Sequence, residues 1–235
     1  FITYHRTDSF NLSELSLSLA KKYILENLGE KYWAGFFRKY QKKIKASQEA
    51  HEAIRPTFPE QTPERLKDKL DKASFKIYDL IWRRFIASQM SKALFEKREI
   101  EILAEGKEKK YIFKGEGEIL KFEGFLKIYP LKFEEKRLPS LKENEKISPK
   151  KLLKKQYFTQ PPKRYTEASL IKVLEKEGIG RPSTYAPILS TIQERNYVKK
   201  DKRGKFYPTE IGRVVSDLLV THFPEIVDIK FTANM

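Results

Sequence analysis

Several residue types and patterns are missing from this chain, and each absence narrows its chemistry. The 235 residues include no cysteine, two methionines and three histidines. Without cysteine the chain forms no disulfide and no thiolate metal site, and the zinc ribbon is excluded with them. It has neither a run of about 18 apolar residues nor a signal-peptide pattern, and it lacks a Gly-rich loop ending in Lys-Ser or Lys-Thr. We therefore expect a cytoplasmic protein that uses neither zinc nor ATP.

Basic residues, in contrast, are abundant. Lysine and arginine number 48 against 32 aspartate and glutamate residues, which gives a net charge of +16 and a pI near 9.7. This balance favours a polyanionic partner, and nucleic acid is the commonest one. An anionic membrane surface or a ribosomal site fits the charge equally well. The length allows one to three domains.

The first nine residues carry the clearest chemical pattern. Tyr4 and Arg6 lie two positions apart, so an extended backbone would place both side chains on the same side. A phenol is a weak nucleophile until a positive neighbour favours the phenolate, and a guanidinium also binds a phosphate oxygen through two donors. The pair is typical of an attacking group and its electrophilic partner at a phosphodiester. The alternative is a half-buried edge strand in which Tyr4 packs and Arg6 is solvated.

Two further clusters carry residue types that suit phosphate chemistry. Residues 47–57 place His51 among acidic and basic neighbours, and an imidazole exchanges a proton near neutral pH, although a lone histidine is more often structural. Residues 174–186 place Arg181 after a Gly-Ile-Gly connector, at the start of an expected helix. A helix N-terminus attracts phosphate, and a tyrosine ring can stack on a base. The alternative here is a plain capped helix with Tyr185 in the core.

With these three clusters in this order, the chain resembles the type IA DNA topoisomerases, most closely the bacterial topoisomerase I branch. The resemblance runs nearly end to end and includes residues 77–90 and 158–170. It implies an ATP-independent enzyme that cleaves and rejoins single-stranded DNA through a 5′-phosphotyrosyl intermediate and so relaxes negative supercoils. It implies that Tyr4 is the nucleophile, that Arg6 stabilises the charge on the phosphoryl oxygens, and that His51 positions the scissile phosphate. The predicted DNA-binding residues are Arg55, Arg181, Ser183, Thr184, Tyr185 and Arg195.

The same resemblance implies a cofactor and partners beyond the chain. Mg²⁺ is expected in the full enzyme, with ligands in a nucleotidyl-transfer domain that precedes Tyr4, because no Asp-x-Asp-x-Glu pattern occurs here. We expect an internal part of a longer, monomeric enzyme, since the chain lacks an initial methionine. Its predicted partners are single-stranded or negatively supercoiled DNA of the nucleoid and the remaining domains of the parent polypeptide, without a membrane. By itself the chain should bind single-stranded DNA and relax plasmids poorly or not at all.

The predicted fold class is α+β with several domains. Two helical, winged-helix or CAP-like domains are expected, joined by the antiparallel β arch domain of a toroidal clamp, as the resemblance implies. Residues 1–91 are predicted to be the helical domain with the catalytic tyrosine. Its helices should begin at a cap on Asn11 or Ser13 and, as one long helix, at Pro63. The aromatic and basic stretch at residues 32–43 fits base stacking as well as plain helix packing.

The rest of the chain changes character twice. Segments within residues 92–162 alternate apolar and polar side chains with period two, which predicts an antiparallel sheet with one solvated face. The resemblance implies that this part is the β arch. Residues 163–235 run helix, turn, helix, hairpin, helix, which is typical of a winged-helix-like domain, here incomplete, that binds single-stranded DNA. The expected strands cover residues 99–102, 110–114, 118–122 and 125–129, and the expected helix caps are Thr166, Ser183 and Thr209.

Three rival interpretations remain open at this stage. A non-catalytic winged-helix DNA-binding protein would rest on charge and the C-terminal region alone. The topoisomerase half of a reverse gyrase would need a helicase-like ATPase elsewhere in the parent polypeptide. A tyrosine recombinase fits poorly, because such enzymes use several scattered arginines, carry the tyrosine late in the chain and form the opposite phosphotyrosyl polarity.

Overall fold

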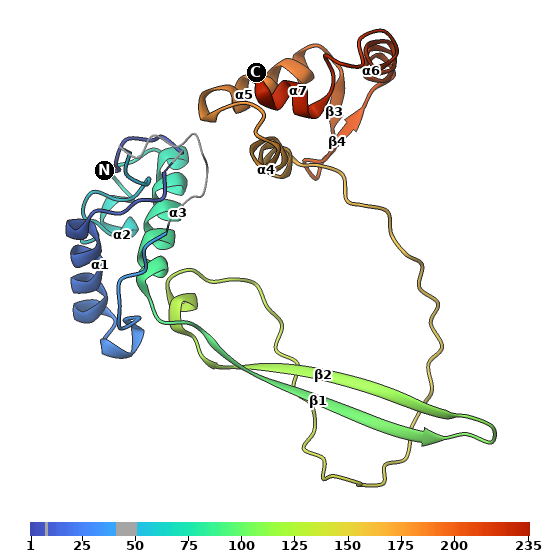
Figure 1. Ribbon diagram of the computed structural model, residues 1–235. Helices are drawn as coiled ribbons and strands as arrows, with labels where there is room; N and C mark the ends of the chain where they lie inside the picture. The colour runs from blue at the N-terminus through green and yellow to red at the C-terminus, as the bar shows by residue number, and fades with distance from the viewer. Residues whose placement is uncertain (8, 41–50) are drawn as a thin grey trace. The chain divides into compact units, whose positions relative to one another are not determined.

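The computed structural model describes residues 1–7, 9–40 and 51–235 (Figure 1). These residues form two compact units, Phe1–Ser148 and Pro149–Met235, and the fold is α+β, with two two-stranded antiparallel sheets in the described part. Among the described residues, none of the helices has the length and apolar character needed to cross a membrane. The division into three domains at residues 91 and 162 stays a prediction.

The first helix of unit 1 forms where the sequence predicts it. Helix α1 spans Glu14–Asn27, and its N-cap is Ser13, whose hydroxyl accepts a hydrogen bond from Ser16 N at 3.3 Å. A serine oxygen at this position satisfies one of the N–H groups that a helix start leaves without a partner. A short 3₁₀ helix, η1, follows at Glu30–Tyr32. The choice between Asn11 and Ser13 as the cap is thus settled for Ser13.

The single long helix predicted from Pro63 is wrong, because the chain forms two helices there. Helix α2 spans Pro63–Leu66 and helix α3 spans Lys72–Gln89. The second start comes from Asp71, whose carboxylate accepts hydrogen bonds from the N–H groups of Ala73 at 2.9 Å and Ser74 at 3.1 Å. An aspartate cap of this kind begins a helix and interrupts the one before it.

The core of unit 1 lies where α1 packs against α3. Trp82 on α3 is buried, and its indole Nε1 donates to Pro59 O at 2.8 Å. Tyr78, one turn earlier, donates its hydroxyl to Gln61 O, and burial raises the pKa of Tyr78 to about 12. Pro56 is also fully buried. These contacts hold residues 59–61, just before α2, against α3. The segment at residues 51–56, which is part of the candidate site, comes just before them in the chain.

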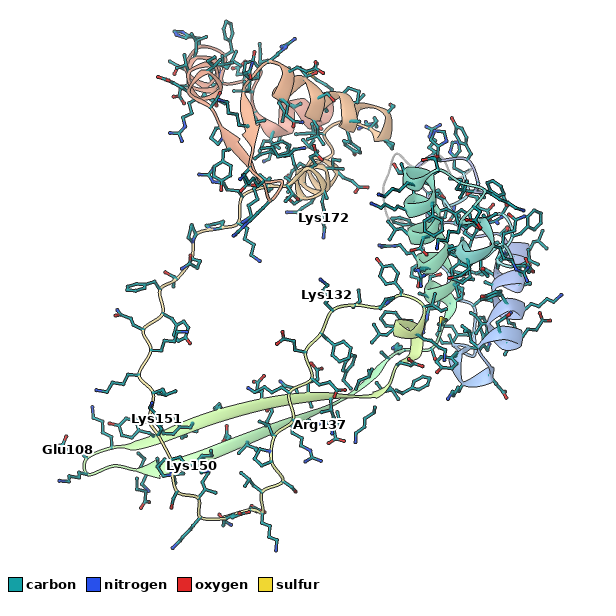
Figure 2. The ribbon with its side chains drawn as sticks, turned by 180° about the vertical axis from the view of Figure 1, so that it is seen from behind. Glu108, Lys132, Arg137, Lys150, Lys151 and Lys172 are labelled. Carbon is teal, nitrogen blue, oxygen red and sulfur yellow. The ribbon has the colours of Figure 1, made fainter. Side chains whose placement is uncertain are left out.

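A long β-hairpin leaves this core (Figure 1). Strand β1, Leu94–Glu105, pairs antiparallel with strand β2, Lys110–Phe122, and Glu108 lies in the turn between them (Figure 2). Residues 118–122 therefore end β2 and do not form a separate strand. The prediction of a strand at residues 125–129 is wrong, since the 3₁₀ helix η2 spans Gly124–Lys127.

The turn at Gly124 explains that difference. Its φ of +48° is unfavourable for other residues, and a Cβ at this position would lie 2.4 Å from Lys92 O. The chain therefore turns sharply after β2, and Phe125 N donates to Ser91 O at 3.0 Å. The alternating pattern of residues 125–129 reflects packing of this turn against the core, where Leu126 is buried.

Unit 2 has the predicted order of helix, turn, helix, hairpin and helix. Thr166 caps its first helix by accepting from Ser169 N at 3.3 Å, as predicted. Ser183 as the second cap is wrong, because Pro182 already occupies the first helical position and Arg181 is the N-cap. A further helix beyond the predicted ones, α7, ends the unit. Its elements are α4 (Glu167–Glu177), α5 (Pro182–Glu194), β3 (Val198–Lys200), β4 (Phe206–Pro208), α6 (Glu210–His222) and α7 (Ile229–Asn234).

At Gly212, α6 passes very close to the backbone of Tyr197, the residue before the β3–β4 hairpin. A Cβ added there would lie 2.0 Å from Tyr197 O, a backbone atom that has little room to move. We expect Gly212→Ala to lower the free energy of unfolding by about 1–3 kcal/mol, as other overpacked sites do. Ser216→Ala, at an exposed position of the same helix, is the matched control. Urea unfolding of both variants makes the comparison, and equal stabilities would contradict the close approach.

Candidate functional site

The backbone at Tyr4 is not extended, and that prediction is wrong. Ile2 forms an isolated antiparallel bridge with Pro56, and the chain bends at Thr3. Arg6 N then donates to Tyr4 O at 2.9 Å, which closes a three-residue turn. Strand alternation therefore does not orient Tyr4 and Arg6, which are joined by this backbone turn instead.

Hydrogen bonds from a distant segment close the loop that carries Tyr4. On one side, Thr3 Oγ1 donates to Ala53 O at 2.8 Å and accepts from Arg55 N at 3.0 Å. On the other side, Ala53 N donates to Asn11 O at 2.8 Å. The described residues 4–7, 9 and 10, which we call the Tyr4 loop, are thus flanked on both sides by residues bonded to the same short stretch of backbone. This arrangement positions the loop without a strand.

The Tyr4 side chain is presented to solvent. It is 70% exposed, and its ring lies 5.2 Å from the ring of His5, centroid to centroid. A side chain that attacks a bulky polymer must be reachable from outside, so this exposure suits a nucleophile and not a core tyrosine. The alternative in which Tyr4 packs in a half-buried strand does not describe this structure.

Arg6, two residues after Tyr4 in the chain, contacts His51. Arg6 Nη1 lies 3.5 Å from His51 Nε2, and since arginine nitrogens only donate, Nε2 is the acceptor in this contact. The structure thus brings together residues that are 45 positions apart in the sequence. The rest of the predicted cluster, Ser47–Ala50, lies outside the described residues, as do Asp8 and the aromatic-basic stretch beyond Tyr40.

The residues that follow His51 include an ion pair between Glu52 and Arg55. One carboxylate oxygen of Glu52 accepts a hydrogen bond from Arg55 Nε at 2.8 Å, and the other accepts one from Arg55 Nη2 at 2.9 Å. The third nitrogen, Nη1, donates to Pro56 O at 3.0 Å, and Ser13 N donates to Glu52 at 2.9 Å. The Arg55 side chain is only 11% exposed. Arg55 therefore positions the segment beside the Tyr4 loop, and its predicted contact with DNA stays a prediction.

Glu52 is ionised under all ordinary conditions. Burial by itself would raise the pKa of its carboxyl, but hydrogen bonds from Arg55 and Ser13 outweigh burial and lower the pKa to about 2. A carboxyl whose pKa is lowered by folding adds stability at pH values above its ordinary pKa, near 4.5. That contribution is lost as the pH falls from about 5 toward 2.

The replacement Glu52→Gln should separate this contribution from general acid effects. We expect it to lower the free energy of unfolding at pH 7 by about 1–2 kcal/mol, which allows for partial solvent screening. The difference from the unmodified chain should shrink as the pH falls from 5 to 2. Glu26→Gln, at an exposed position of α1, is the control. Urea unfolding at pH 7 and pH 3 measures both, and a pH-independent difference would contradict the assigned pKa.

Four of the five predicted residues of unit 2 lie at the start of α5, namely Arg181, Ser183, Thr184 and Tyr185. Arg181 Nη1 donates to Gly180 O at 2.7 Å and to Gly178 O at 3.3 Å, so the guanidinium folds over its own loop. Thr184 Oγ1 accepts from Arg181 N at 2.8 Å. The ring of Tyr185 lies so close to Gly180 that a Cβ there would be 3.1 Å from it. Tyr185 is therefore part of the packing of this turn.

Ser183 and Arg195 complete the predicted set in unit 2. Both are exposed, and Arg195 is the C-cap of α5. Arg181 and Arg195 lie at opposite ends of this helix, about 20 Å apart along its axis. Their predicted contacts with DNA stay predictions.

Sequence reasoning missed the supporting residues of this site. Thr3 and Asn11 hold the ends of the Tyr4 loop, and Glu52 anchors Arg55. The Glu52–Arg55 spacing of three residues is compatible with a local ion pair, and this was the available signal. The contacts of Thr3 and Asn11 leave no signal in the sequence, since their partners lie some 40 to 50 positions away.

Comparison with known proteins gives a consistent result. The family model described as DNA topoisomerase matches residues 1–235. Proteins named DNA topoisomerase 1 from Rickettsia felis and Rickettsia conorii are each 45% identical over 240 residues, covering 100% of this chain and 30% of their own length. The structure of full-length topoisomerase I from Thermotoga maritima is 37% identical with a TM-score of 0.79, covering 100% of this chain and 37% of that one. The chain thus spans about a third of these relatives.

Proposed function

This chain belongs to the type IA DNA topoisomerase family, in its bacterial topoisomerase I branch, and from that premise we propose that it carries the strand-cleaving tyrosine of an ATP-independent enzyme. The enzyme would cleave and rejoin single-stranded DNA and relax negative supercoils. The observation that supports this most directly is the exposed Tyr4, in the same loop as an arginine, Arg6, that contacts His51. The relatives named DNA topoisomerase 1 favour this branch over the reverse gyrases.

Each residue of the group has a distinct part in the proposed reaction. The Tyr4 oxygen attacks phosphorus, a phosphotyrosyl ester forms at the 5′ end of one fragment, and the bond to the 3′ oxygen breaks to leave a 3′-hydroxyl. Arg6 stabilises the charge that builds on the phosphoryl oxygens, and His51 positions the phosphate. Return of the 3′-hydroxyl reverses the step. Because the ester conserves the bond energy, supercoil strain alone drives relaxation.

Unit 2 would bind the strand that Tyr4 cleaves. Its order of helix, turn, helix, hairpin and helix supports a winged-helix assignment, and the positive end of α5 suits phosphate. In this proposal the β1–β2 hairpin belongs to the arch of a toroidal clamp and acts as a hinge while the other strand passes. The proposed contacts come from Arg181, Ser183, Thr184, Tyr185 and Arg195, with Arg55 in unit 1.

The described residues do not fit a magnesium site. Throughout residues 1–7, 9–40 and 51–235 no group of three or more acidic or histidine side chains is placed to hold a metal. The proposed steps use only side chains of this chain. We propose that the Mg²⁺ ligands lie elsewhere in the parent enzyme, and we expect the 235 residues alone to relax plasmids poorly or not at all.

The polarity of the covalent bond tests the proposed function. A single-stranded oligonucleotide is labelled at its 3′ end in one sample and at its 5′ end in another, and each is trapped with the complete enzyme under denaturing conditions. A 5′-phosphotyrosyl ester keeps the 3′-labelled fragment on the protein and releases the 5′-labelled one. The reverse retention would indicate a recombinase-like reaction. Normal DNA binding with no retained label would favour the non-catalytic DNA-binding protein.

A further inference from the structure

A cleft of about 700 Å³ opens directly beside the Tyr4 loop in unit 1. This volume lies within the range of sites that take ligands the size of a nucleotide. Thr7 and Ser9 of the loop form part of its lining, and α3 forms another part with Leu80, Ile81 and Arg84. The cleft therefore begins three residues after Tyr4 in the same loop.

Aromatic side chains contribute much of the lining. Phe10 of the Tyr4 loop is 48% exposed and Tyr40 is 44% exposed. Phe85, Phe125 and Tyr129 line the same cleft from α3 and from the turn after β2. Exposed rings offer flat surfaces on which an unpaired base stacks, whatever its identity. Phe10 and Tyr40 are open to water, whereas Phe85 is 5% exposed and belongs to the core of unit 1.

Among the described residues, the charged side chains that line the cleft are all basic. Arg38 and Arg84 are its only charged lining residues in the described part of the chain, and no acidic residue accompanies them. Arg38 is held in place, since its Nη1 donates to Ser88 O at 3.3 Å. Arg84 is exposed at the surface of α3. Rings beside guanidinium groups complement a base joined to a phosphate, whereas an apolar protein segment would need no cations.

We propose that this cleft binds one nucleotide of single-stranded DNA next to the bond that Tyr4 cleaves. The base stacks among the rings, and Arg84 binds the adjoining phosphate. The inference rests on the proposed function, because that function brings the strand to Tyr4. Since a base in a duplex is already stacked and paired, only a single strand can place a base here.

Paired substitutions on α3 test the occupant by binding. Arg84→Ala should weaken binding of a fluorescent single-stranded oligonucleotide and reduce the salt dependence by about one phosphate contact. Lys76→Ala, at an exposed position of α3 that does not line the cleft, should do so less. Leu80→Trp fills the cleft and should weaken binding roughly tenfold. Ile77→Trp, at an equally exposed position outside it, should have little effect.

Photocrosslinking locates the base independently of these variants. The oligonucleotide carries 5-iododeoxyuridine at one position at a time, and the Tyr4→Phe enzyme prevents cleavage. We expect crosslinks to Phe10, Tyr40 or Tyr129 from one position near the cleavage site. Crosslinks only outside the cleft, with equal binding by Arg84→Ala and Lys76→Ala, would overturn the inference.

The remaining outcomes are also distinct. If a protein segment fills the cleft, Leu80→Trp lowers the melting temperature more than Ile77→Trp and no crosslink reaches the rings, which overturns the inference. If Leu80→Trp does not fold, the comparison of Arg84→Ala with Lys76→Ala and the crosslinks still test the inference. A retained crosslink in the cleft without any covalent adduct in the unmodified enzyme would refute the proposed function and leave the binding site standing.

Discussion

Replacing Tyr4 with phenylalanine is expected to abolish the covalent adduct between the complete enzyme and single-stranded DNA. The substitution removes only the attacking oxygen and keeps the ring, so the Tyr4 loop should retain its backbone hydrogen bonds. Noncovalent binding of a single-stranded oligonucleotide should stay close to that of the unmodified enzyme. The adduct is measured by denaturing electrophoresis with a 3′-labelled oligonucleotide.

A second exposed tyrosine serves as the control for this change. Tyr157 is 77% exposed and lies in unit 2, outside the group around Tyr4. Tyr157→Phe should therefore leave the adduct unchanged. If Tyr4→Phe still formed the adduct, the nucleophile would be another residue, and the proposed role of Tyr4 would be refuted. If neither the unmodified enzyme nor Tyr157→Phe formed an adduct, a DNA-binding protein without catalytic activity would be the better description.

Replacing Arg6 with alanine should slow cleavage by about 10²- to 10³-fold, the effect of removing one preorganised donor from a developing negative charge. Arg6→Lys should recover part of the rate, because an ammonium keeps the charge and loses the planar pair of donors. The measurement is single-turnover cleavage of a single-stranded oligonucleotide at saturating enzyme. Saturation separates the chemical step from DNA binding.

The control for Arg6 is a cation elsewhere on unit 1. Lys69 is exposed and lies between α2 and α3, so Lys69→Ala should change the cleavage rate little. A loss of affinity in Arg6→Ala with an unchanged saturated rate would show that Arg6 only attracts DNA. In that case the contact between Arg6 Nη1 and His51 Nε2 would serve binding and not charge stabilisation.

Helix starts were predicted correctly where a single capping residue determines them. Ser13 and Thr166 cap their helices as predicted, since a hydroxyl needs only the N–H groups of the next turn. Prediction failed where two local signals compete. Asp71 ends the expected long helix by starting another, and Pro182 moves the N-cap from Ser183 to the residue before it.

Sequence order and residue chemistry alone pointed to the family and to Tyr4 as the nucleophile, because the three clusters are short and contiguous in the chain. Only the tertiary structure decided how Tyr4 is presented. Its loop is held by Ala53 and Arg55, about 50 positions away from Thr3, through hydrogen bonds. The cleft likewise combines the loop, α3 and the turn after β2. Backbone propensity acts over a few residues, so contacts across such separations appear only once the core has formed.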